Sequence, residues 1–418
     1  MEPPLIYNLF PRLAGHMGQW PAHARRALEM GFNWIFVNPI QYPGFSGSLY
    51  AVKDVYRLNP LFVPPGTTDP DQALRHTLDE LHRLGLKVML DLVINHTAKD
   101  SPLVAAHPDW FRRDGSGAVV SPSAIDPADT RRVTVWGDLA EVDNAGSPDR
   151  QGLWAFWTAA ADHYLDLGFD GFRCDAAYKV PRELWEHLIG AARRRRLETV
   201  FVAETLGCRL PEVRSLAGAG FDYLLNSSKW WTFDAPWCLE QHEQFGRIAP
   251  SIAFPESHDT PRLMAETGGL LAVQKQRYAF AACFSTGLLM PVGYELGFTK
   301  KLDVVRTTPA DWEQSGIDIG PFVRRVNRLK LGSAVLGAEG QWTMLSRADL
   351  PTIVLRKTEA QAQAVVAINK DWHAPQTCLL PPGLAGRMLR PFREDAGPAP
   401  LPDRPIELGP AEVVLIVS

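Results

Sequence analysis

Three acidic residues each stand where an apolar run of the sequence ends. Asp175 closes the segment GFDGFRCD, Glu204 follows VFVA, and Asp259 follows AFPESH. Short apolar runs bounded by polar or turn residues are typical of buried parallel strands. In a parallel α/β barrel, the carboxyl ends of the strands carry the chemistry. The three carboxylates are therefore predicted to meet at one mouth of a barrel, as candidate catalytic residues that cleave a glycosidic bond.

Asp175 has an arginine two residues before it, in the motif FRCD. Alternate side chains of a strand share a face, so Arg173 and Asp175 are expected to point into the same site. A nearby guanidinium favours the ionised form of a carboxyl group, and an ionised carboxylate can attack an electrophilic carbon. Asp175 is the predicted nucleophile, and a purely structural Arg–Asp pair is the alternative interpretation of this motif alone.

Glu204 and Asp259 complete the predicted trio. Glu204 emerges from an apolar strand with no cation beside it in the sequence, and apolar surroundings raise a carboxyl pKa. A protonated Glu204 is the predicted general acid, which donates to the leaving glycosidic oxygen. Asp259 follows His258, and both are predicted to hold the distorted sugar ring. A helix cap is the alternative for each carboxylate, with Pro261 in the first turn after Asp259.

Further side chains have the chemistry to contact a sugar. The carboxylate, amide and imidazole of DLVINHT can bond hydroxyl groups, and aromatic faces can stack on pyranose rings. No second histidine lies at ligand spacing from His96, which argues against a metal role for that residue. For each aromatic residue, packing in the core is the alternative. These candidate contacts are Tyr50, Asp91, Asn95, His96, Trp230 and Trp231.

Strand-like and helix-like segments alternate along most of the chain, which predicts a (β/α)8 TIM barrel, although a doubly wound sheet has the same local pattern. The predicted strands are Leu5–Phe10, Trp34–Pro39, Lys87–Val93, Phe169–Asp175, Thr199–Thr205, Phe221–Asn226, Ser251–Ser257 and Gly287–Gly293. The predicted helices are His23–Met30, Asp71–Leu84, Trp154–Leu167, Arg182–Arg194, Leu270–Ser285 and a closing helix over Pro309–Leu331.

Two regions depart from the βα rhythm. The stretch over about 97–149 is rich in Pro, Gly and Asp and too long for a βα turn, so an inserted loop subdomain is predicted there, after the third strand. From about residue 332 the sequence changes to short β-rich pieces such as TIVLRK and AVVAINK. The predicted organisation is a catalytic barrel over 1–331 and a C-terminal antiparallel β-sandwich over 332–418.

Composition excludes several classes of partner. The 418 residues carry 43 basic and 47 acidic side chains, a net charge of 43 − 47 = −4, which does not suggest a nucleic-acid partner. No uncharged run approaches the roughly 18 residues that span a bilayer, and MEPPLIYNLF lacks the basic start and apolar stretch of a signal peptide. Five cysteines without CxxC spacing favour reduced thiols, and hence a cytoplasmic protein. Oligomeric state is not predicted.

Five motifs resemble the α-amylase family, glycoside hydrolase family 13, and in the order of its signature regions. They are DLVINH, LAEVDN with Asp143 and Asn144, GFRCDAA, VAET and ESHD. The resemblance implies a barrel with a loop domain after the third strand and a C-terminal β-sandwich. It also implies Asp175 as nucleophile, Glu204 as acid/base and Asp259 as transition-state stabiliser. Around the cleaved sugar it places Tyr50, His96, Arg173 and His258.

Many calcium-dependent members of the family carry a Lys-His pair three and four residues after the nucleophile, where this chain has Tyr178 and Lys179. This departure argues against a calcium ion, and no cofactor is predicted; Lys179 is a candidate contact for a sugar or a phosphate. The predicted function is retaining cleavage of α-glucosidic bonds in maltooligosaccharides or α-1,4-glucan. The alternatives are a transglycosylase, such as a maltosyltransferase that uses maltose 1-phosphate, and a catalytically inactive carbohydrate-binding scaffold.

Overall fold

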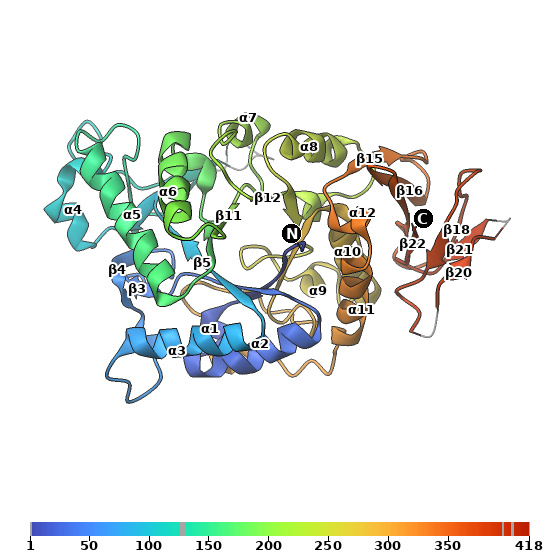
Figure 1. Cartoon of the computed structure of the whole chain (residues 1–418), viewed down its shortest axis with the longest axis horizontal. Coiled ribbons are helices and arrows are strands. Elements are labelled where there is room, and N and C mark those ends of the chain that lie inside the picture. The colour runs from blue at the N-terminus through green and yellow to red at the C-terminus, as the bar shows by residue number, and fades with distance from the viewer. Residues whose placement is uncertain (1, 126–130, 132, 395–396, 403–404, 418) are drawn as a thin grey trace.

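Eight parallel strands close into a barrel in the computed structural model, which describes residues 2–125, 131, 133–394, 397–402 and 405–417. The strand order around the barrel is β1-β14-β13-β12-β11-β10-β5-β2 (Figure 1). The barrel strands are β1 (Leu5–Leu9), β2 (Trp34–Val37), β5 (Lys87–Leu92), β10 (Gly171–Cys174), β11 (Val200–Ala203), β12 (Tyr223–Leu225), β13 (Ser251–Ala253) and β14 (Gly287–Pro291). The predicted (β/α)8 barrel is confirmed.

Alternation along the strands separates the inside of the barrel from its helical shell. In β11, Val200 and Val202 pack with the inner cluster, whereas Phe201 and Ala203 face the helices. Phe172 and Cys174 of β10 also belong to the outer core. Arg173 lies between them, so the period of two directs its side chain inward.

Helices cover the outside of the barrel and pack their apolar stripes against the strands (Figure 1). The longer ones are α2 (Trp20–Glu29), α3 (Pro70–Arg83), α5 (Arg150–Leu167), α6 (Arg182–Arg195), α8 (Trp237–Gly246), α10 (Leu271–Phe284) and α11 (Gly320–Leu331). The short ones are α1 (Pro11–Ala14), α7 (Leu210–Arg214), α9 (Leu263–Glu266) and α12 (Ala334–Gly337). Among the described residues, no helix is both long and apolar enough to cross a membrane.

The predicted closing helix over Pro309–Leu331 is wrong in its first half. Only a 3-10 turn forms over Pro309–Asp311, and α11 begins at Gly320. Gly316 has a φ of +71°, outside the helical region. The Asp318 carboxylate then accepts from the N–H of Gly320 at 2.7 Å, and Pro321 occupies the first turn. A proline suits a first helical turn because no partner for its N–H is needed there.

The segment between β5 and α5 folds over the barrel mouth as small paired pieces, at the left of Figure 1. It contains β6 (His96–Ala98) paired with β9 (Leu139–Glu141), β7 (Ser123–Ile125) paired with β8 (Val133–Val135), and α4 (Pro102–Ala106). A hairpin of β3 (Gln41–Pro43) and β4 (Val52–Leu58) follows β2 and also lies outside the barrel sheet. The sequence analysis did not predict this hairpin.

Two antiparallel sheets follow the barrel. The larger has the order β15-β16-β17-β22-β19-β20, and the smaller pairs β18 with β21. Their bounds are β15 (Gln341–Met344), β16 (Thr352–Glu359), β17 (Ala362–Asn369), β18 (Gln376–Cys378), β19 (Arg387–Leu389), β20 (Ala399–Pro400), β21 (Ile406–Leu408) and β22 (Val413–Val417). Apolar residues of both sheets share one core, which is the packing of a sandwich.

Two buried lysines bond to the end of α10, one from α11 of the barrel and one from β16 of the sandwich. Nζ of Lys330, on α11, donates to the carbonyls of Ala282 and Ser285 at 2.8 and 2.6 Å. Nζ of Lys357, on β16, donates to the carbonyls of Cys283 and Phe284 at 3.1 and 3.2 Å. Since the last carbonyls of a helix lack partners within it, these lysines satisfy the C-terminus of α10.

Candidate active site

Arg173 lies at the centre of a cluster of three carboxylates, of which Asp91 and Asp175 are buried and Glu204 is half-buried. Its Nη1 contacts Oδ1 of Asp91 at 2.8 Å and Oδ1 of Asp175 at 2.7 Å, and its Nη2 lies 3.4 Å from Oε2 of Glu204. The strand order explains the arrangement. β10 lies between β5 and β11, and Arg173 is in register with Asp91 on one side and Val202 on the other. One guanidinium therefore collects acidic groups from three adjacent strands.

Glu204 stands two residues beyond Val202 and is held by the chain that follows Asp175. The N–H of Ala176 donates to Oε2 of Glu204 at 2.6 Å. Burial raises the pKa of Glu204 to about 7, opposed by Arg173 and assisted by the negative charges of Asp175 and Asp259. The sequence shows no cation next to Glu204, and the fold supplies Arg173 from the neighbouring strand. A carboxyl group with a pKa near neutrality can both donate and accept a proton.

Tyr50 connects the arginine cluster to the loop that carries Asp259. Its hydroxyl donates to Oδ2 of Asp91 at 2.7 Å and lies 2.7 Å from Nε2 of His258. The two rings are parallel, with centroids 5.8 Å apart. Burial lowers the pKa of His258, so its neutral ring donates from Nε2 to the tyrosine oxygen. The same nitrogen lies 3.1 Å from Oδ2 of Asp259. Asp259 is not the cap of α9, because α9 begins at Leu263 with Arg262 at the N-cap position.

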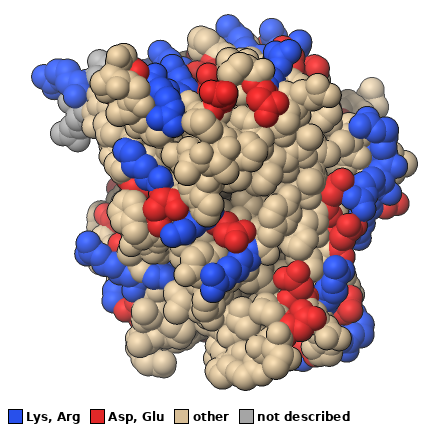
Figure 2. Space-filling view, turned by 90° about the vertical axis from the view of Figure 1, so that its left-hand side faces the viewer, with Lys and Arg blue, Asp and Glu red and all other residues tan. Residues whose placement is uncertain are grey.

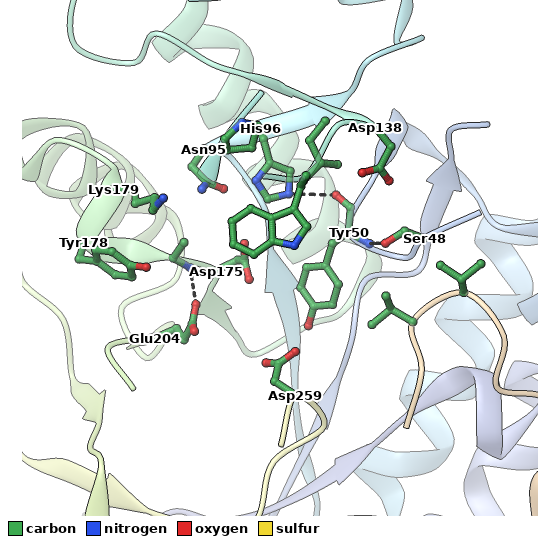
Figure 3. Close-up of a pocket in the computed structure, with 16 residues that line it drawn as sticks. Ser48, Tyr50, Asn95, His96, Asp138, Asp175, Tyr178, Lys179, Glu204 and Asp259 are labelled. Carbon is green, nitrogen blue, oxygen red and sulfur yellow. Dashed lines mark hydrogen bonds between the residues drawn. The ribbon is translucent and has the colours of Figure 1, made fainter. Parts of the chain in front are cut away.

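A pocket of about 440 Å³ opens above these groups (Figure 3). Asp175, Glu204 and Asp259 surround it, with Tyr50 along one wall. Figure 2 looks onto the side of the molecule where the inserted segment lies; acidic and basic side chains are interspersed on it around a central hollow. The other lining residues are Ser48, Asn95, His96, Pro122, Trp136, Asp138, Leu139, Ala176, Tyr178, Lys179, Val304 and Val305.

The predicted sugar contacts divide into two groups. Tyr50, Asn95, His96 and Lys179 line the pocket with the acidic trio. Asp91, Arg173 and His258 are buried beneath it and contact the lining groups instead. Asp91 is fully buried and bonded to both Tyr50 and Arg173, so it orients other side chains.

The predicted hydrogen bond from His96 to a sugar requires a correction. Nε2 of His96 lies 3.1 Å from the carbonyl oxygen of Tyr50, and burial lowers the pKa of the ring. A neutral imidazole has one N–H, and in His96 it donates to the carbonyl oxygen of Tyr50. Nδ1 of His96 and Oδ1 of Asn95 are buried without a partner. Both atoms are therefore available as acceptors for hydroxyl groups.

The tryptophan pair does not reach the pocket. Trp231 is fully buried and packs against Phe233 and Phe280 in the core, so core packing is the correct interpretation for it. Trp230 is 43% exposed but lies outside the pocket lining, edge-on to Phe254. Instead, the inserted segment contributes Trp136, which sequence reasoning missed. Its position three residues before LAEVDN was the available signal.

A metal site in a protein needs several donor side chains placed around one point. Within the described residues, no group of three or more His, Cys, Asp or Glu side chains is placed to hold a metal ion. Lys179 projects into the pocket, and its ammonium group contacts the carbonyl of Ser123 on β7. The absence of a metal or cofactor from the site stays a prediction.

An eight-stranded parallel barrel with an inserted segment, a C-terminal sandwich and a carboxylate trio at its strand ends is an architecture of the glycoside hydrolases. Comparison with known proteins identifies the family more closely. Residues 5–111 match the model for the glucanotransferase domain of glycogen debranching enzyme. Over 94% of its length, the chain is 27% identical to an α-1,4-glucan:maltose-1-phosphate maltosyltransferase of Burkholderia pseudomallei.

Other relatives are amylases. A maltogenic α-amylase of Bacillus acidopullulyticus is 23% identical over 82% of this chain. The crystal structure of an α-amylase from Lactobacillus plantarum superimposes with a TM-score of 0.77, covering 99% of this chain and 98% of that one at 22% identity. This chain spans 36% of the maltosyltransferase and 60% of the maltogenic amylase. These relatives and structural neighbours are members of the α-amylase family, glycoside hydrolase family 13, and this chain is similar to them over most of its length.

Proposed function

We propose that this protein cleaves α-glucosidic bonds of maltooligosaccharides or α-1,4-glucan with net retention, through a covalent glycosyl–Asp175 intermediate. The observation that carries the proposal is the contact of Asp175 and Glu204 with the two terminal nitrogens of one guanidinium. Retaining enzymes hold their two carboxyl groups about 5–5.5 Å apart, whereas inverting ones leave room for a water between them. A shared arginine supports the closer arrangement.

The first half of the reaction uses both carboxyl groups. Asp175 is ion-paired with Arg173, and its oxygen attacks the anomeric carbon. Glu204, protonated because burial raises its pKa to about 7, transfers its proton to the departing glycosidic oxygen. The bond from the anomeric carbon to that oxygen breaks, and the bond to Asp175 forms.

The second half reverses these roles. Glu204, now ionised, takes a proton from the acceptor hydroxyl, which attacks the anomeric carbon and displaces Asp175. Asp259 and Tyr50 line the same sugar position, with His258 in contact with both from beneath, and support the flattened ring of each transition state. Two displacements at one carbon give net retention.

Transfer to a second sugar is the alternative to hydrolysis, because the acceptor in the second step is water or a sugar hydroxyl. The maltosyltransferase name of the Burkholderia relative favours transfer, as does Lys179, a cation at the pocket edge that suits a phosphate leaving group. The names of the maltogenic amylase relative and of the α-amylase structure favour hydrolysis.

Incubation with maltoheptaose, followed by chromatography and proton NMR of the first products, tests the proposal. Release of the α-anomer supports retention, and initial release of the β-anomer contradicts it. Products that are only shorter indicate hydrolysis, and products both longer and shorter indicate transfer. A parallel incubation with maltose 1-phosphate and an acceptor glucan, with phosphate release as the readout, tests the sugar phosphate as donor. Inactivity on every substrate would contradict catalysis altogether.

We also propose that the protein works in a reducing compartment. All five cysteines are free, and all but Cys208 are buried. Buried unpaired thiols without a disulfide partner are typical of proteins of the cytoplasm. Thiol titration of protein purified without a reductant tests this proposal, with five reactive groups expected after denaturation.

A further inference from the structure

The pocket has two ends, which the catalytic groups distinguish. A general acid protonates the oxygen of the leaving group, so the leaving group lies on the side of Glu204. Figure 3 shows Tyr178 and Lys179 beyond Glu204 on that side, with Tyr50 and Ser48 on the opposite side of Asp175. The cleaved sugar lies between Tyr50 and the two catalytic carboxylates. Further sugars of the donor chain must therefore extend toward Ser48, Val304 and Val305.

Two loops meet at this donor end. One is the turn between β3 and β4, and the other lies within the long segment between β14 and α11. The N–H of Leu49 donates to the carbonyl of Val304 at 3.2 Å, and the Leu49 side chain is fully buried. A methyl group placed on Gly47 would lie 3.9 Å from Cγ1 of Val305. The loops are thus joined by a backbone hydrogen bond, and the turn at Gly47 lies beside Val305.

The loop that carries Val304 and Val305 is a tight, hydrogen-bonded turn. Oδ1 of Asp303 accepts from the N–H groups of both Val305 and Arg306 at 2.8 Å. The N–H of Asp303 donates to the hydroxyl of Thr307, also at 2.8 Å. These bonds hold Val304 and Val305 at the pocket edge. Ser48, Val304 and Val305 thus line the donor end of the pocket, and Figure 3 places Asp138 on the same side.

Ser48, Val304 and Val305, on the two joined loops, form a wall at the donor end of the pocket. We infer that this wall makes the protein act from the non-reducing end of its glucan, releasing or transferring a short segment of fixed length. The inference rests on the proposed function and adds the mode of attack on the chain. A cleft that cuts within a polymer must let the chain leave at both ends. Here the pocket, about 440 Å³, is in the lower part of the range of about 300–1,000 Å³ that ligand pockets occupy.

A pair of substrates tests the inference. One is 4-nitrophenyl α-maltoheptaoside with a free non-reducing end, and the other carries a 4,6-O-ethylidene group on that end. The wall should exclude the blocked end, so we expect consumption of the blocked substrate to be slower by about 100-fold, as for a misplaced reacting bond. From the free substrate, one short product should dominate at early times. Equal rates on both substrates, or an even ladder of early products, would overturn the inference.

The two proposals fail differently. If both substrates are consumed at the same rate, the result supports glucan cleavage and contradicts attack from the non-reducing end. Consumption of neither, over a range of enzyme concentration that would detect about one part in 10⁴ of ordinary amylase turnover, removes glucan cleavage and the chain-end mode with it.

Loosening the wall gives an independent check. Asp303→Ala removes both acceptor bonds that hold the valine turn. We expect the blocked-to-free rate ratio to rise about tenfold or more, as one steric barrier is relieved. Asp311→Ala is the matched control. Asp311 accepts from the N–H of Thr308 at 2.8 Å in the same segment but does not line the pocket, so its variant should keep the wild-type ratio. An unchanged ratio in a folded Asp303→Ala variant would contradict the wall.

Discussion

The backbone N–H of Ala176 donates to Oε2 of Glu204 at 2.6 Å, and Ala176 holds this position in the left-handed conformation, with φ 42° and ψ 46°. Alanine in that region costs about 1–2 kcal/mol. The strained residue directly follows Asp175 in the chain, so one unfavourable turn connects the predicted nucleophile to the predicted acid. Strain of this kind persists where the surrounding structure imposes it.

Ala176→Gly should relieve the strain and keep the N–H that Glu204 accepts. We expect the free energy of unfolding to rise by up to about 1 kcal/mol, because the relieved strain is partly offset by the larger entropy loss of glycine. Turnover should stay within about twofold of wild type. Ala176→Val, which is β-branched, should lose stability instead. Chemical denaturation of the three proteins compares them, and a less stable glycine variant would contradict the strain.

Asp175→Asn should lower kcat by about 10⁴-fold or more, since an amide does not form the glycosyl intermediate. Asp138→Asn is the control, because Asp138 lines the same pocket without contacting Arg173. It should retain activity within about tenfold and a similar melting temperature. Comparable activity in Asp175→Asn and wild type would rule out the assigned nucleophile.

Glu204→Gln should discriminate between leaving groups. Natural glucans need a proton on the departing oxygen, so their cleavage should fall by about 10²–10⁴-fold. A glycosyl fluoride needs little protonation, and formation of the glycosyl–enzyme from it should be nearly unimpaired. Single-turnover measurements on both substrates separate the effects. An equal loss on the two would mean that Glu204 is not the acid.

The pH dependence of kcat/KM should show a basic limb near pH 7, because Glu204 must be protonated and its pKa is raised to about 7. The same shift bears on stability. The folded protein binds more protons than the unfolded one between pH 4.5 and 7, so this group's contribution is present at low pH and is lost as pH rises toward 7. Glu204→Gln should remove that contribution, which denaturation of both proteins at several pH values measures.

Lys357→Met should destabilise the contact between barrel and sandwich. Two carbonyls of α10 lose their donor, and we expect the free energy of unfolding to fall by about 1–3 kcal/mol. Burial lowers the pKa of Lys357 to about 8, so between about pH 8 and 10.5 the unfolded protein binds more protons and wild type gains stability as pH rises. The variant should lack this gain. Exposed Lys301→Met is the control, with little change expected at any pH.

Local pattern was sufficient for much of the fold. The barrel strands are short apolar runs between turn residues. Asp175 and Glu204 directly follow β10 and β11, and Asp259 lies on the loop after β13. The local pattern predicted a helix through residues 312–319 that does not form. Helix-compatible residues surround Gly316, which has a positive φ, and α11 begins only at Gly320. The local pattern also failed at Trp230 and Trp231, because a pair of adjacent aromatic residues has the same composition whether it stacks on a sugar or fills a core.

The order of residues along the chain determined which side chains point into the barrel, since the period of two in β10 turns Arg173 inward whatever its partners are. Tertiary structure alone decided what Arg173 meets there. Asp91, Asp175 and Glu204 come together because β5, β10 and β11 are neighbours in the closed sheet. The joining of the loops at Leu49 and Val304, over 250 residues apart in the chain, was likewise decided by barrel closure, which places β2 and β14 on either side of β1 and brings the segments after them to one mouth.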